Sequence, residues 1–457
     1  MRKQREHWGS RIGFIMAAAG SSIGLGTLWM FPYLTGENGG GLFVLIYLIA
    51  MLFVGFPIFI AELILGRSTE RSAVGAFAEH THSESQWKIV GWMGAMASFL
   101  IMSYYGVIAG WGIHYVGLSL SEFYAGRTAD EIVSVFGILE RSGDINILWH
   151  GLFSIMTVSV VYMGVRNGIE RWSFLMTSSL LVMLLLLFVY ALNLDGFSDA
   201  LHFIFYPDIA KLKPSGVLEA LGLSFFTLSL GQGVMITYGS YMRKDEDVPR
   251  MGMIIVLMDV LVSLLAAMVI FPIIFTFGFE PKSGPGLVFK ILPVAFSQLP
   301  AARLISSSFF LLFVFTALTS SVALIEVVVA NFIDLYGWTR KRTCLIVGTA
   351  VFIVGIPTAL GQSGGVFENW AAIYGMSYFE VMSTIVSNWL LPIGGLMTAI
   401  FTGWRLRREV IEREFKRGTE WAWLFRPWLL MVRWVAPTAT LLIILYKTGL
   451  IDVDLLF

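Results

Sequence analysis

The stretch AAAGSSIGLGTLWMFPYLTGENGGG, residues 17–41, decides how the rest of the sequence is interpreted. It lies in an apolar run that begins near Ile12 and is long enough to cross a bilayer. Poor helix formers interrupt this run, namely Gly20, Gly24 and Gly26 with Ser21 and Ser22. Each interior glycine costs about 1 kcal/mol relative to alanine, and serine hydroxyls compete for backbone hydrogen bonds. We therefore expect the helix to break within the membrane.

A break in this position would create a place for ligands. Unwound backbone is tolerated in hydrocarbon only where it is buried in protein or lines a cavity. The N–H groups that begin the second half-helix would suit a carboxylate, and the carbonyls that end the first half would suit a cation. The same glycines also fit a helix-packing face, because Gly20 and Gly24 have the small-xxx-small spacing. The stretch alone leaves both interpretations open.

The composition is that of a polytopic membrane protein. Of 457 residues, 57% are hydrophobic and 14% are charged, and the mean hydropathy is +0.77. The 31 Lys and Arg balance 31 Asp and Glu, so no net charge favours a nucleic-acid partner. The single Cys344 excludes an internal disulfide and a cysteine metal cluster. The basic N-terminus precedes a long apolar run without a small-residue cleavage site, which predicts a retained first span.

Apolar runs of about 18 or more residues predict eleven spans. They lie near 12–35, 42–66, 89–122, 147–163, 170–192, 216–241, 253–279, 304–336, 343–360, 372–404 and 427–449. The clusters of Lys and Arg then all fall on one side of the membrane. We expect a multi-pass protein of the cell (inner or plasma) membrane, with its N-terminus cytoplasmic and Phe457 outside. No linker divides the chain, so we treat 1–457 as a single transmembrane domain.

A second interruption lies in FFTLSLGQGVMITYGSY, residues 225–241. It places Ser229, Gly231, Gln232 and Gly233 in the middle of the sixth span. Breaks in the first and sixth spans are typical of two inverted five-helix repeats with a binding site at the midplane. We expect an all-α protein with one repeat at about 10–192, a second at about 214–404 and an additional helix at about 427–449. Both breaks favour transport over simple packing.

The eighth span places three hydroxyls on one helical face, at Thr316, Thr319 and Ser320. Such oxygens suit a hard cation, although Ser and Thr in membrane helices also bond back to their own i−4 carbonyls. Asp259 in the seventh span is a functional-site hypothesis by default, because a carboxylate at membrane depth is costly. Three further acids were expected to bond to helix backbones and to Ser or Thr hydroxyls, namely Glu62, Glu326 and Glu380.

Several motifs together resemble those of a known family. They are REHWGSRIGF (5–14), GSSIGLGTLWMFPYLTGENGGG (20–41), the pair Tyr104 and Tyr105, NGIERW (167–172), FFTLSLGQGVMITYGSYMRKDED (225–247) and LTSS (318–321). Over essentially its whole length the sequence resembles the neurotransmitter:sodium symporter family, most closely its bacterial amino-acid transporters. The resemblance implies the leucine-transporter-like fold and uptake of a solute by alternating access, coupled to sodium entry.

The resemblance also implies a substrate site. The substrate carboxylate would meet the backbone N–H groups of Leu25 and Gly26 and the hydroxyl of Tyr105. Family members that carry amines without a carboxylate tend to hold Asp at position 24, so Gly24 implies a neutral amino acid. The other substrate-binding positions would be Ser22, Ile101, Phe226, Thr227, Ser229, Gln232, Ser320, Ala323 and Leu324. Gln232 hints at a polar group or aromatic N–H on the substrate, or else bonds to Ser229 and narrows the pocket.

Two sodium sites follow from the same resemblance. The first would use the carbonyls of Gly20, Ile23 and Thr316 with the hydroxyls of Thr319 and Ser320. The second would use the Ser22 carbonyl with Thr27, Thr227 and Asp259. Here the sequence departs from the family, which usually has Asn at positions 27 and 259. Thr27 is shorter, and Asp259 adds a charge that chloride-dependent relatives obtain from the anion, so chloride is not expected. No organic cofactor is implied.

The resemblance further implies two gates that differ in kind. The family often has Arg at position 30, Asp at 383 and Gln at 223, whereas this sequence has Met30, Ser383 and Leu223. The outer gate should therefore close by apolar contact and by a lid of Tyr105 and Phe226. The inner gate is present in the sequence as Arg5, Trp8, Asp334 and Tyr241.

Other functions are less favoured. GQSGG (361–365) formally matches the nucleophile-elbow pattern of an enzyme, but no strand–turn–helix surrounds it. A non-transporting amino-acid sensor of the same fold would need a signalling domain, which we do not expect in the short termini. A channel would lack the two gates. We therefore expect a transporter and not an enzyme, with an amino acid as its small-molecule partner and the lipid bilayer around it.

Overall fold

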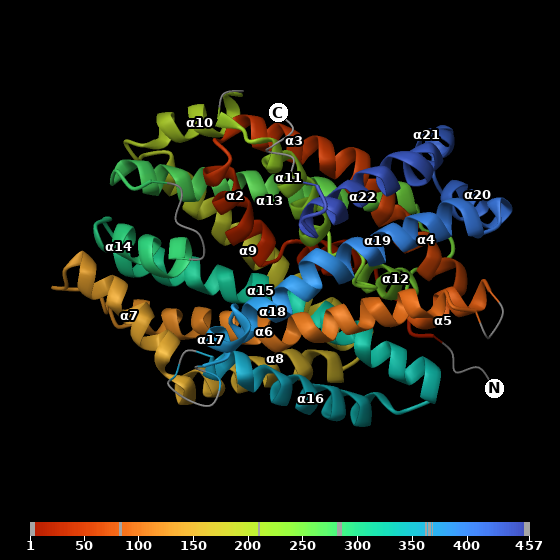
Figure 1. Cartoon of the computed structure of the whole chain (residues 1–457), viewed down its shortest axis with the longest axis horizontal. Helices are drawn as coiled ribbons and strands as arrows, with labels where there is room; N and C mark the ends of the chain where they lie inside the picture. The colour runs from red at the N-terminus through yellow and green to blue at the C-terminus, as the bar shows by residue number, and fades with distance from the viewer. Residues whose placement is uncertain are drawn as a thin grey trace.

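The computed structural model describes residues 5–81, 85–208, 211–280, 286–361, 363, 367 and 369–451. Every regular element in these ranges is a helix, and Figure 1 shows the helices packed side by side in one bundle. Nine are long and apolar enough to cross a membrane: Gly41–Thr69, Lys88–Leu120, Gly143–Tyr162, Val165–Ala191, Val248–Thr276, Ala302–Tyr336, Arg340–Leu360, Tyr378–Arg405 and Ala422–Lys447. The expected all-helical membrane fold is confirmed.

Most of these spans are single α-helices, and the others contain short π-helical turns. The single helices are α6 (Lys88–Leu120), α8 (Gly143–Tyr162), α13 (Val248–Thr276), α15 (Ala302–Tyr336) and α16 (Arg340–Leu360). The interrupted ones contain α3 (Gly41–Ala50) with α4 (Phe56–Thr69), η3 (Val165–Glu170) with α9 (Arg171–Ala191), α18 (Tyr378–Thr384) with α19 (Leu391–Ile400), and α21 (Phe425–Leu430) with α22 (Ala436–Lys447). π-Helical turns are often found at functional sites.

The first span is broken as the sequence predicts. Helix α1 (Arg11–Ser22) is separated from η1 (Gly26–Met30) and α2 (Phe31–Glu37), and the two halves are bent by 50°. Ser10 caps α1 by accepting a hydrogen bond from the Gly13 N–H at 2.9 Å. The glycine- and serine-rich sequence therefore produces a cap, a helix and a sharp stop within one span.

The sixth span is also divided. Helix α11 (Pro214–Thr227) and α12 (Val234–Gly239) are joined by a turn at 228–233. Three residues of that turn are left-handed, with φ of 54° at Ser229, 73° at Gly231 and 74° at Gly233. A serine rarely adopts this conformation, which cannot continue a right-handed helix. With the bent first span, the described residues contain up to ten candidate spans, against the eleven predicted; α11 and α12 lie where the sixth was predicted, and each is too short to count as a span by itself.

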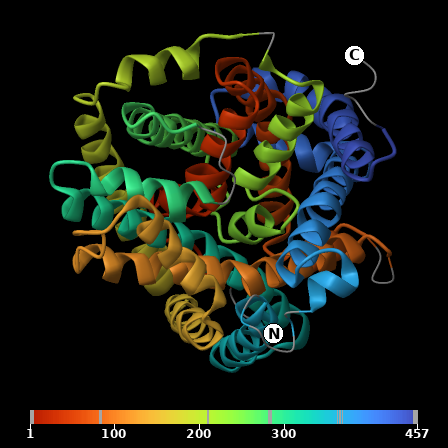
Figure 2. The same cartoon turned by 60° about the vertical axis from the view of Figure 1, so that its left-hand side comes forward.

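Helix α15 is the centre of the bundle. In its most apolar 18-residue window 94% of residues are buried, against 33% in that of Val165–Ala191, which faces outward. Both α1 and α12 contact α15, and α6 packs along it. Figure 2 shows the first and sixth spans, in red and yellow-green, side by side and surrounded by the later helices. Both breaks are thus enclosed by protein.

Shorter helices lie between the spans and were not predicted from the sequence. They are α5 (Ala73–Glu79), α7 (Ala129–Arg141), α10 (Phe197–Phe205), η5 with α14 (Leu287–Ser297), α17 (Trp370–Tyr374) and α20 (Arg408–Lys416). Most of the loop PKSGPGL, most of GQSGG and Phe457 lie outside the described residues.

Candidate functional site

The two broken spans meet at α15. The carbonyl of Ser21, at the end of α1, accepts hydrogen bonds from the hydroxyl of Ser229 at 3.2 Å and from that of Ser320 at 3.0 Å. The Ser320 hydroxyl also lies 3.4 Å from the carbonyl of Gly20. Three segments far apart in the sequence therefore direct polar groups toward the end of one half-helix.

Residues 24–26 form the start of the second half-helix. The N–H groups of Thr27 and Leu28 turn back to the carbonyl of Gly24, whereas the Leu25 N–H donates to the Tyr105 hydroxyl at 3.2 Å. A Cβ atom at Gly24 would lie 2.9 Å from Ser320 Oγ and 3.5 Å from the Tyr105 hydroxyl oxygen. Glycine thus keeps open the space between these groups. Two donors, one N–H and one O–H, border a space suited to an anionic group.

The apolar residues predicted to contact substrate lie on three elements, α6, α15 and α11. Ile101 lies one turn before Tyr105 on α6, and both side chains are buried. Ala323 and Leu324 lie one turn after Ser320 on α15 and are also buried. Phe226, at the end of α11, is near Gly26, whose added Cβ would lie 2.7 Å from the ring. The walls are therefore mainly apolar.

Polar groups lie on the opposite side, at the breaks. The Gln232 carbonyl accepts a hydrogen bond from Ser98 Oγ at 2.9 Å, and Gln232 is 3% exposed. The Ser22 hydroxyl is buried and has no hydrogen-bond partner within the described part of the chain. Ser98 was not predicted, because a serine within a long apolar helix gives no local signal of the segment that it contacts.

The residues predicted for the first sodium site face one another across α1 and α15. The Thr319 hydroxyl donates to the carbonyl of Thr316 at 3.0 Å, and a Cβ at Gly20 would lie 3.1 Å from Thr319 Cβ. The Thr316 hydroxyl bonds back to Leu312 in its own helix, as the alternative interpretation expects. Ser320 instead crosses to α1. A hydroxyl that donates a hydrogen bond still offers lone pairs to a cation.

The second predicted sodium site is a buried cluster around Asp259. Its carboxylate accepts hydrogen bonds from the Thr27 hydroxyl at 3.0 Å and from the Tyr47 hydroxyl at 3.3 Å. The Tyr47 hydroxyl also lies 3.2 Å from Thr227 Oγ1 and 3.4 Å from Ser263 Oγ. The presence of Tyr47 and Ser263 in this cluster was not predicted, because a tyrosine in an apolar run is typical of a core residue. The short side chain of Thr27 nevertheless reaches Asp259.

Asp259 is 0% exposed, and among the described residues it forms no ion pair with Lys, Arg or His. A buried carboxylate without a countercharge is costly, and hydrogen bonds from neutral hydroxyls compensate only part of that cost. A cation beside Asp259 would supply the missing charge. The donor set of carboxylate and hydroxyl oxygens fits a hard cation such as sodium.

At one end of the bundle the predicted inner gate residues form a polar cluster. Arg5 contacts Asp334 at 2.5 Å and donates to Ser240 at 2.7 Å. The Trp8 indole N–H donates to the Tyr238 carbonyl at 3.0 Å, and Trp8 is 1% exposed. The N-terminal segment is thereby fixed against the sixth and eighth spans.

Glu326 and Arg340 extend this inner cluster. Arg340 holds the buried Glu326 with two hydrogen bonds, at 2.7 and 3.0 Å, and the Tyr241 hydroxyl donates to the same carboxylate at 2.5 Å. The expectation that Glu326 bonds to backbone or to Ser and Thr hydroxyls is therefore wrong. Glu380 does bond to backbone, because its carboxylate accepts from the Ser377 N–H at 2.7 Å in a capping box, but it lies at the exposed start of a span and not in its interior. Glu62 does bond to backbone, at the Gly231 N–H.

Glu170 fastens the start of α1 to the fifth span. Its carboxylate accepts hydrogen bonds from the Gly9 N–H at 2.6 Å, the Ser10 N–H at 3.0 Å and the Ser10 hydroxyl at 2.9 Å. Glu6 in turn accepts from the Val165 N–H at 2.8 Å. These contacts were not predicted, although Glu170 stands in the motif NGIERW. They connect the N-terminal segment to the π-helical turn η3.

The residues of the predicted outer gate have different surroundings. Met30, Leu223 and Phe226 line one cavity of about 130 Å³. The Ser383 hydroxyl donates to the Glu380 carbonyl of its own helix at 3.1 Å. Met30 and Leu223 therefore contribute apolar side chains to a cavity whose wall also contains Glu219 and Lys447.

The sequence and the structure were compared with known proteins. The model of the Sodium:neurotransmitter symporter family matches residues 5–134 and 121–444. An uncharacterized sodium-dependent transporter of Bacillus subtilis, YhdH, is 37% identical over 446 residues, which cover 97% of this chain and 98% of YhdH. A similarly named protein of Methanocaldococcus jannaschii is 33% identical over 447 residues, covering 92% of this chain and 87% of that protein.

A solved structure agrees with these matches. The crystal structure of MhsT in complex with L-phenylalanine superposes with a TM-score of 0.88 and is 38% identical, covering 97% of this chain and all of that one. The motifs, the two broken spans and the enclosed polar groups between them are therefore explained together. The chain belongs to the sodium:neurotransmitter symporter family.

Proposed function

We propose that this protein is a sodium-coupled symporter that imports a neutral amino acid by alternating access. As a member of its family it is a sodium-dependent multi-pass membrane transporter and not an enzyme. The observation that carries the substrate class is the pair of donors beside Gly24, the Leu25 N–H and the Tyr105 hydroxyl. The phenylalanine bound to MhsT supports the same class.

The donors beside Gly24 explain how a carboxylate would be recognised. In the structure the Leu25 N–H donates to the hydroxyl oxygen of Tyr105, so these two groups bond to each other. A substrate carboxylate would accept from the N–H and from the O–H, and both hydrogen bonds would be charge-assisted. The positive end of the second half-helix would add to this attraction. The apolar residues Ile101, Ala323 and Leu324 would receive the substrate side chain.

Sodium ions would join the moving segments. The first ion would lie between α1 and α15, at the carbonyls of Gly20 and Thr316 and the hydroxyls of Thr319 and Ser320. The second would lie beside Asp259, whose charge would replace the chloride of other family members. Each ion would bind more tightly to the conformation in which its ligands are brought together, and would thereby stabilise that conformation. Only such a difference in sodium affinity between conformations can couple sodium binding to transport.

The membrane potential would supply part of the driving force. Moving one elementary charge across 100 mV is worth about 2.3 kcal/mol, so two ions would support substantial accumulation. Import in this direction, from outside to cytoplasm, would release sodium at the end that carries the N-terminus. It requires a cytoplasmic N-terminus and an external C-terminus, as the distribution of Lys and Arg favours. The inner cluster around Arg5 and Asp334 would then open toward the cytoplasm to release substrate and ions.

Uptake into proteoliposomes tests the proposal. The full-length protein should accumulate a labelled neutral amino acid only under an inward sodium gradient, and replacing chloride with gluconate should leave the rate unchanged. A parallel binding screen of the twenty amino acids with and without sodium would identify the substrate. Equal uptake with choline in place of sodium would refute the coupling. Sodium-dependent binding without any uptake would instead identify a sensor of the same fold.

The first sodium site can be tested by replacing its two hydroxyls. Thr319→Ala with Ser320→Ala should weaken apparent sodium affinity by about a hundredfold or more. In other metal sites, mutating a residue that only hydrogen-bonds to a ligand already lowers metal affinity about 10–100-fold. Scintillation proximity binding of labelled substrate against sodium concentration measures this. Ser321→Ala is the matched control, since Ser321 is buried on the same helix and bonds back to Ala317 at 2.7 Å. Equal sodium affinity in the double variant and the control would refute the assignment.

A further inference from the structure

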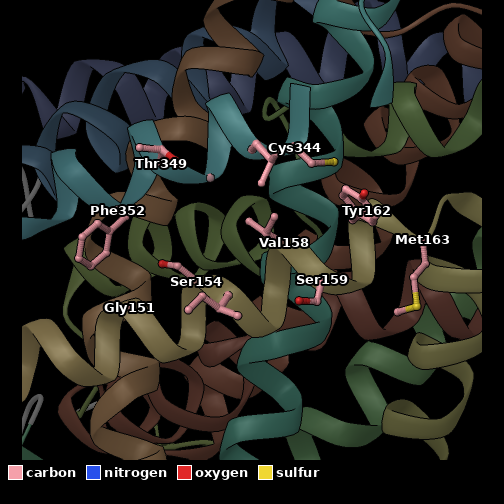
Figure 3. A pocket seen from close by; sticks show the side chains of 12 residues that line it. Gly151, Ser154, Val158, Ser159, Tyr162, Met163, Cys344, Thr349 and Phe352 are labelled. Atoms are coloured by element: carbon pink, nitrogen blue, oxygen red, sulfur yellow. The ribbon is translucent and has the colours of Figure 1, made fainter. Parts of the chain in front are cut away.

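A long groove runs between α8 and α16 on the outside of the bundle (Figure 3). It has a volume of about 760 Å³, and α8 lines it from Gly151 to Met163 while α16 lines it from Cys344 to Phe352. In the most apolar window of each helix only 39% of residues are buried, so both helices present much of their surface to the bilayer. The groove therefore opens toward lipid and is separate from the proposed substrate site.

The groove has the length of one membrane leaflet. The two helices are antiparallel, because Gly151 approaches Phe352 while Gly348 approaches Val158. From Gly151 to Tyr162, eleven residues at 1.5 Å each span about 16 Å. Half of the hydrocarbon core of a bilayer measures about 15 Å. A single acyl chain that enters at one interface would therefore fill the groove to near the midplane.

One end of the groove carries a cationic cluster. Helix α16 begins with Arg340, Lys341 and Arg342, and the last two are exposed. The Lys341 ammonium lies 5.6 Å from the centre of the Tyr162 ring, which lines this end. Tyrosine is enriched where membrane meets water, and Lys and Arg near the interface attract anionic lipid headgroups. This end therefore complements a phosphate.

A polar group also lies within the groove. Ser154 is 5% exposed, and its hydroxyl has no hydrogen-bond partner within the described ranges. Figure 3 shows the Ser154 side chain among the residues that line the groove, between Phe352 and Val158. A serine in a membrane helix usually bonds back to its own helix, so Ser154 contributes a buried hydroxyl without an internal partner to the wall of the groove.

We propose that this groove binds an anionic phospholipid, with one acyl chain between α8 and α16 and the phosphate beside Lys341 and Arg342. The apolar lining matches the chain, the length matches one leaflet, and the cations match the headgroup. The site lies next to the inner cluster, because Arg340 donates both to the Val161 carbonyl of α8 and to Glu326. A bound lipid would brace the pair of helices that Arg340 connects. The proposal does not depend on which substrate is transported.

Photo-crosslinking of the full-length protein tests this site. The protein would be reconstituted in phosphatidylcholine nanodiscs that contain a little phosphatidylglycerol with a diazirine in its acyl chain. After illumination we expect labelled peptides from 151–163 and 344–352. Unlabelled phosphatidylglycerol should reduce this labelling, and added phosphatidylcholine should not. Equal competition by both lipids would overturn the assignment of the anionic headgroup.

Two variants separate the chain site from the headgroup site. Thr349→Trp places a large ring in the groove and should reduce labelling at least about fivefold, whereas Ile353→Trp, exposed on the same helix outside the lining, should not. Lys341→Gln with Arg342→Gln should reduce labelling about five- to twentyfold, since each interfacial cation contributes roughly a factor of five. Arg407→Gln with Arg408→Gln removes two exposed charges elsewhere and is the control.

The remaining outcomes also decide the question. Unchanged labelling in Thr349→Trp would show that the chain does not occupy the groove. If that variant fails to fold, Ser159→Leu fills the same groove from α8 at an exposed position. Protein–protein crosslinks through these peptides, with a dimer in light scattering, would show that a second copy covers the groove and would overturn the proposal.

Discussion

The predicted inner and outer gates differ in the kind of contact that their residues make. At the inner end, Arg5 with Asp334 and Arg340 with Glu326 form charged pairs between segments far apart in the sequence. At the predicted outer end, Met30, Leu223 and Phe226 line a cavity that is mainly apolar, with Glu219 and Lys447 also in its wall, and Ser383 bonds within its own helix. The inner closure therefore depends on a few strong partners, and the outer closure on many weak contacts.

This difference predicts different responses to mutation. Removing one member of a buried charged pair leaves the other charge unpaired and costs several kcal/mol. Removing one apolar side chain from a cavity wall removes only some of the many weak van der Waals contacts that hold the wall together. A single substitution should therefore shift the equilibrium strongly toward the open state at the inner end, and only slightly at the outer end.

The largest effect is expected for Asp334→Asn. Arg5 and Asp334 are only 12% and 9% exposed, so losing the charge should favour the inner-open state by about 2 kcal/mol, or roughly thirtyfold. Alkylation of a cysteine introduced at Ala17, in a Cys344→Ala background, measures the opening. Asp199→Asn at an exposed position is the control. Equal alkylation rates in the two variants would mean that the ion pair does not hold the inner end closed.

A smaller effect should follow from adding a charged pair to the outer end. Met30→Arg with Ser383→Asp should favour the outer-closed state by up to about 1 kcal/mol, or about fivefold, as exposed ion pairs do. The gain should disappear at high salt, because exposed pairs are screened. Labelling of a cysteine at Leu34, which lines the outer cavity, reports the closure. The control is Met30→Arg alone, and a salt-independent gain in the pair would contradict the expected mechanism.

The smallest effect should be a pH dependence confined to the inner end. Burial raises the pKa of Glu246, in the loop between α12 and α13, above its usual value. The folded protein then holds this proton more tightly than the unfolded chain, so stability falls as the pH rises from about 4.5 through the raised pKa. Glu246→Gln should remove this slope, within about 1 kcal/mol, whereas Asp199→Asn, at an exposed position elsewhere, should not. Thermal unfolding from pH 4.5 to 8 measures it, and identical slopes would contradict the prediction.

Hydropathy and glycine content were sufficient to predict the membrane class and the broken first helix. In hydrocarbon the backbone must satisfy its own hydrogen bonds, so a long apolar run has few alternatives to a helix. Gly20, Gly24 and Gly26 weaken the helix locally, and the structure breaks it at Ile23–Leu25. These predictions depend on neighbouring residues in the sequence.

Partners that depend on tertiary structure could not be predicted. Glu326 meets Arg340 only because the chain reverses after α15, and Tyr241 reaches the same carboxylate from 85 residues away. Tyr47 has the appearance of a core residue until α13 brings Asp259 to its hydroxyl. No pattern within a single span carries this information.

Helix α7 is a different case, because the sequence at 128–139 contains the pattern of a helix. Thr128 and Glu131 form a capping box, and the buried Ile132, Phe136 and Leu139 follow at helical spacing. Its short apolar face was missed because the search was for runs long enough to span a membrane.

The contacts of Glu170 determine how the start of α1 would be released. Three donors from Gly9 and Ser10 share the two oxygens of one carboxylate, and the π-helical turn η3 carries that carboxylate. Any displacement of the turn strains all three hydrogen bonds together, so they would be lost in one cooperative step and not one after another. Departure of the N-terminal segment would then have two discrete states and a single relaxation time. A continuous range of intermediate distances in single-molecule fluorescence would contradict such a step.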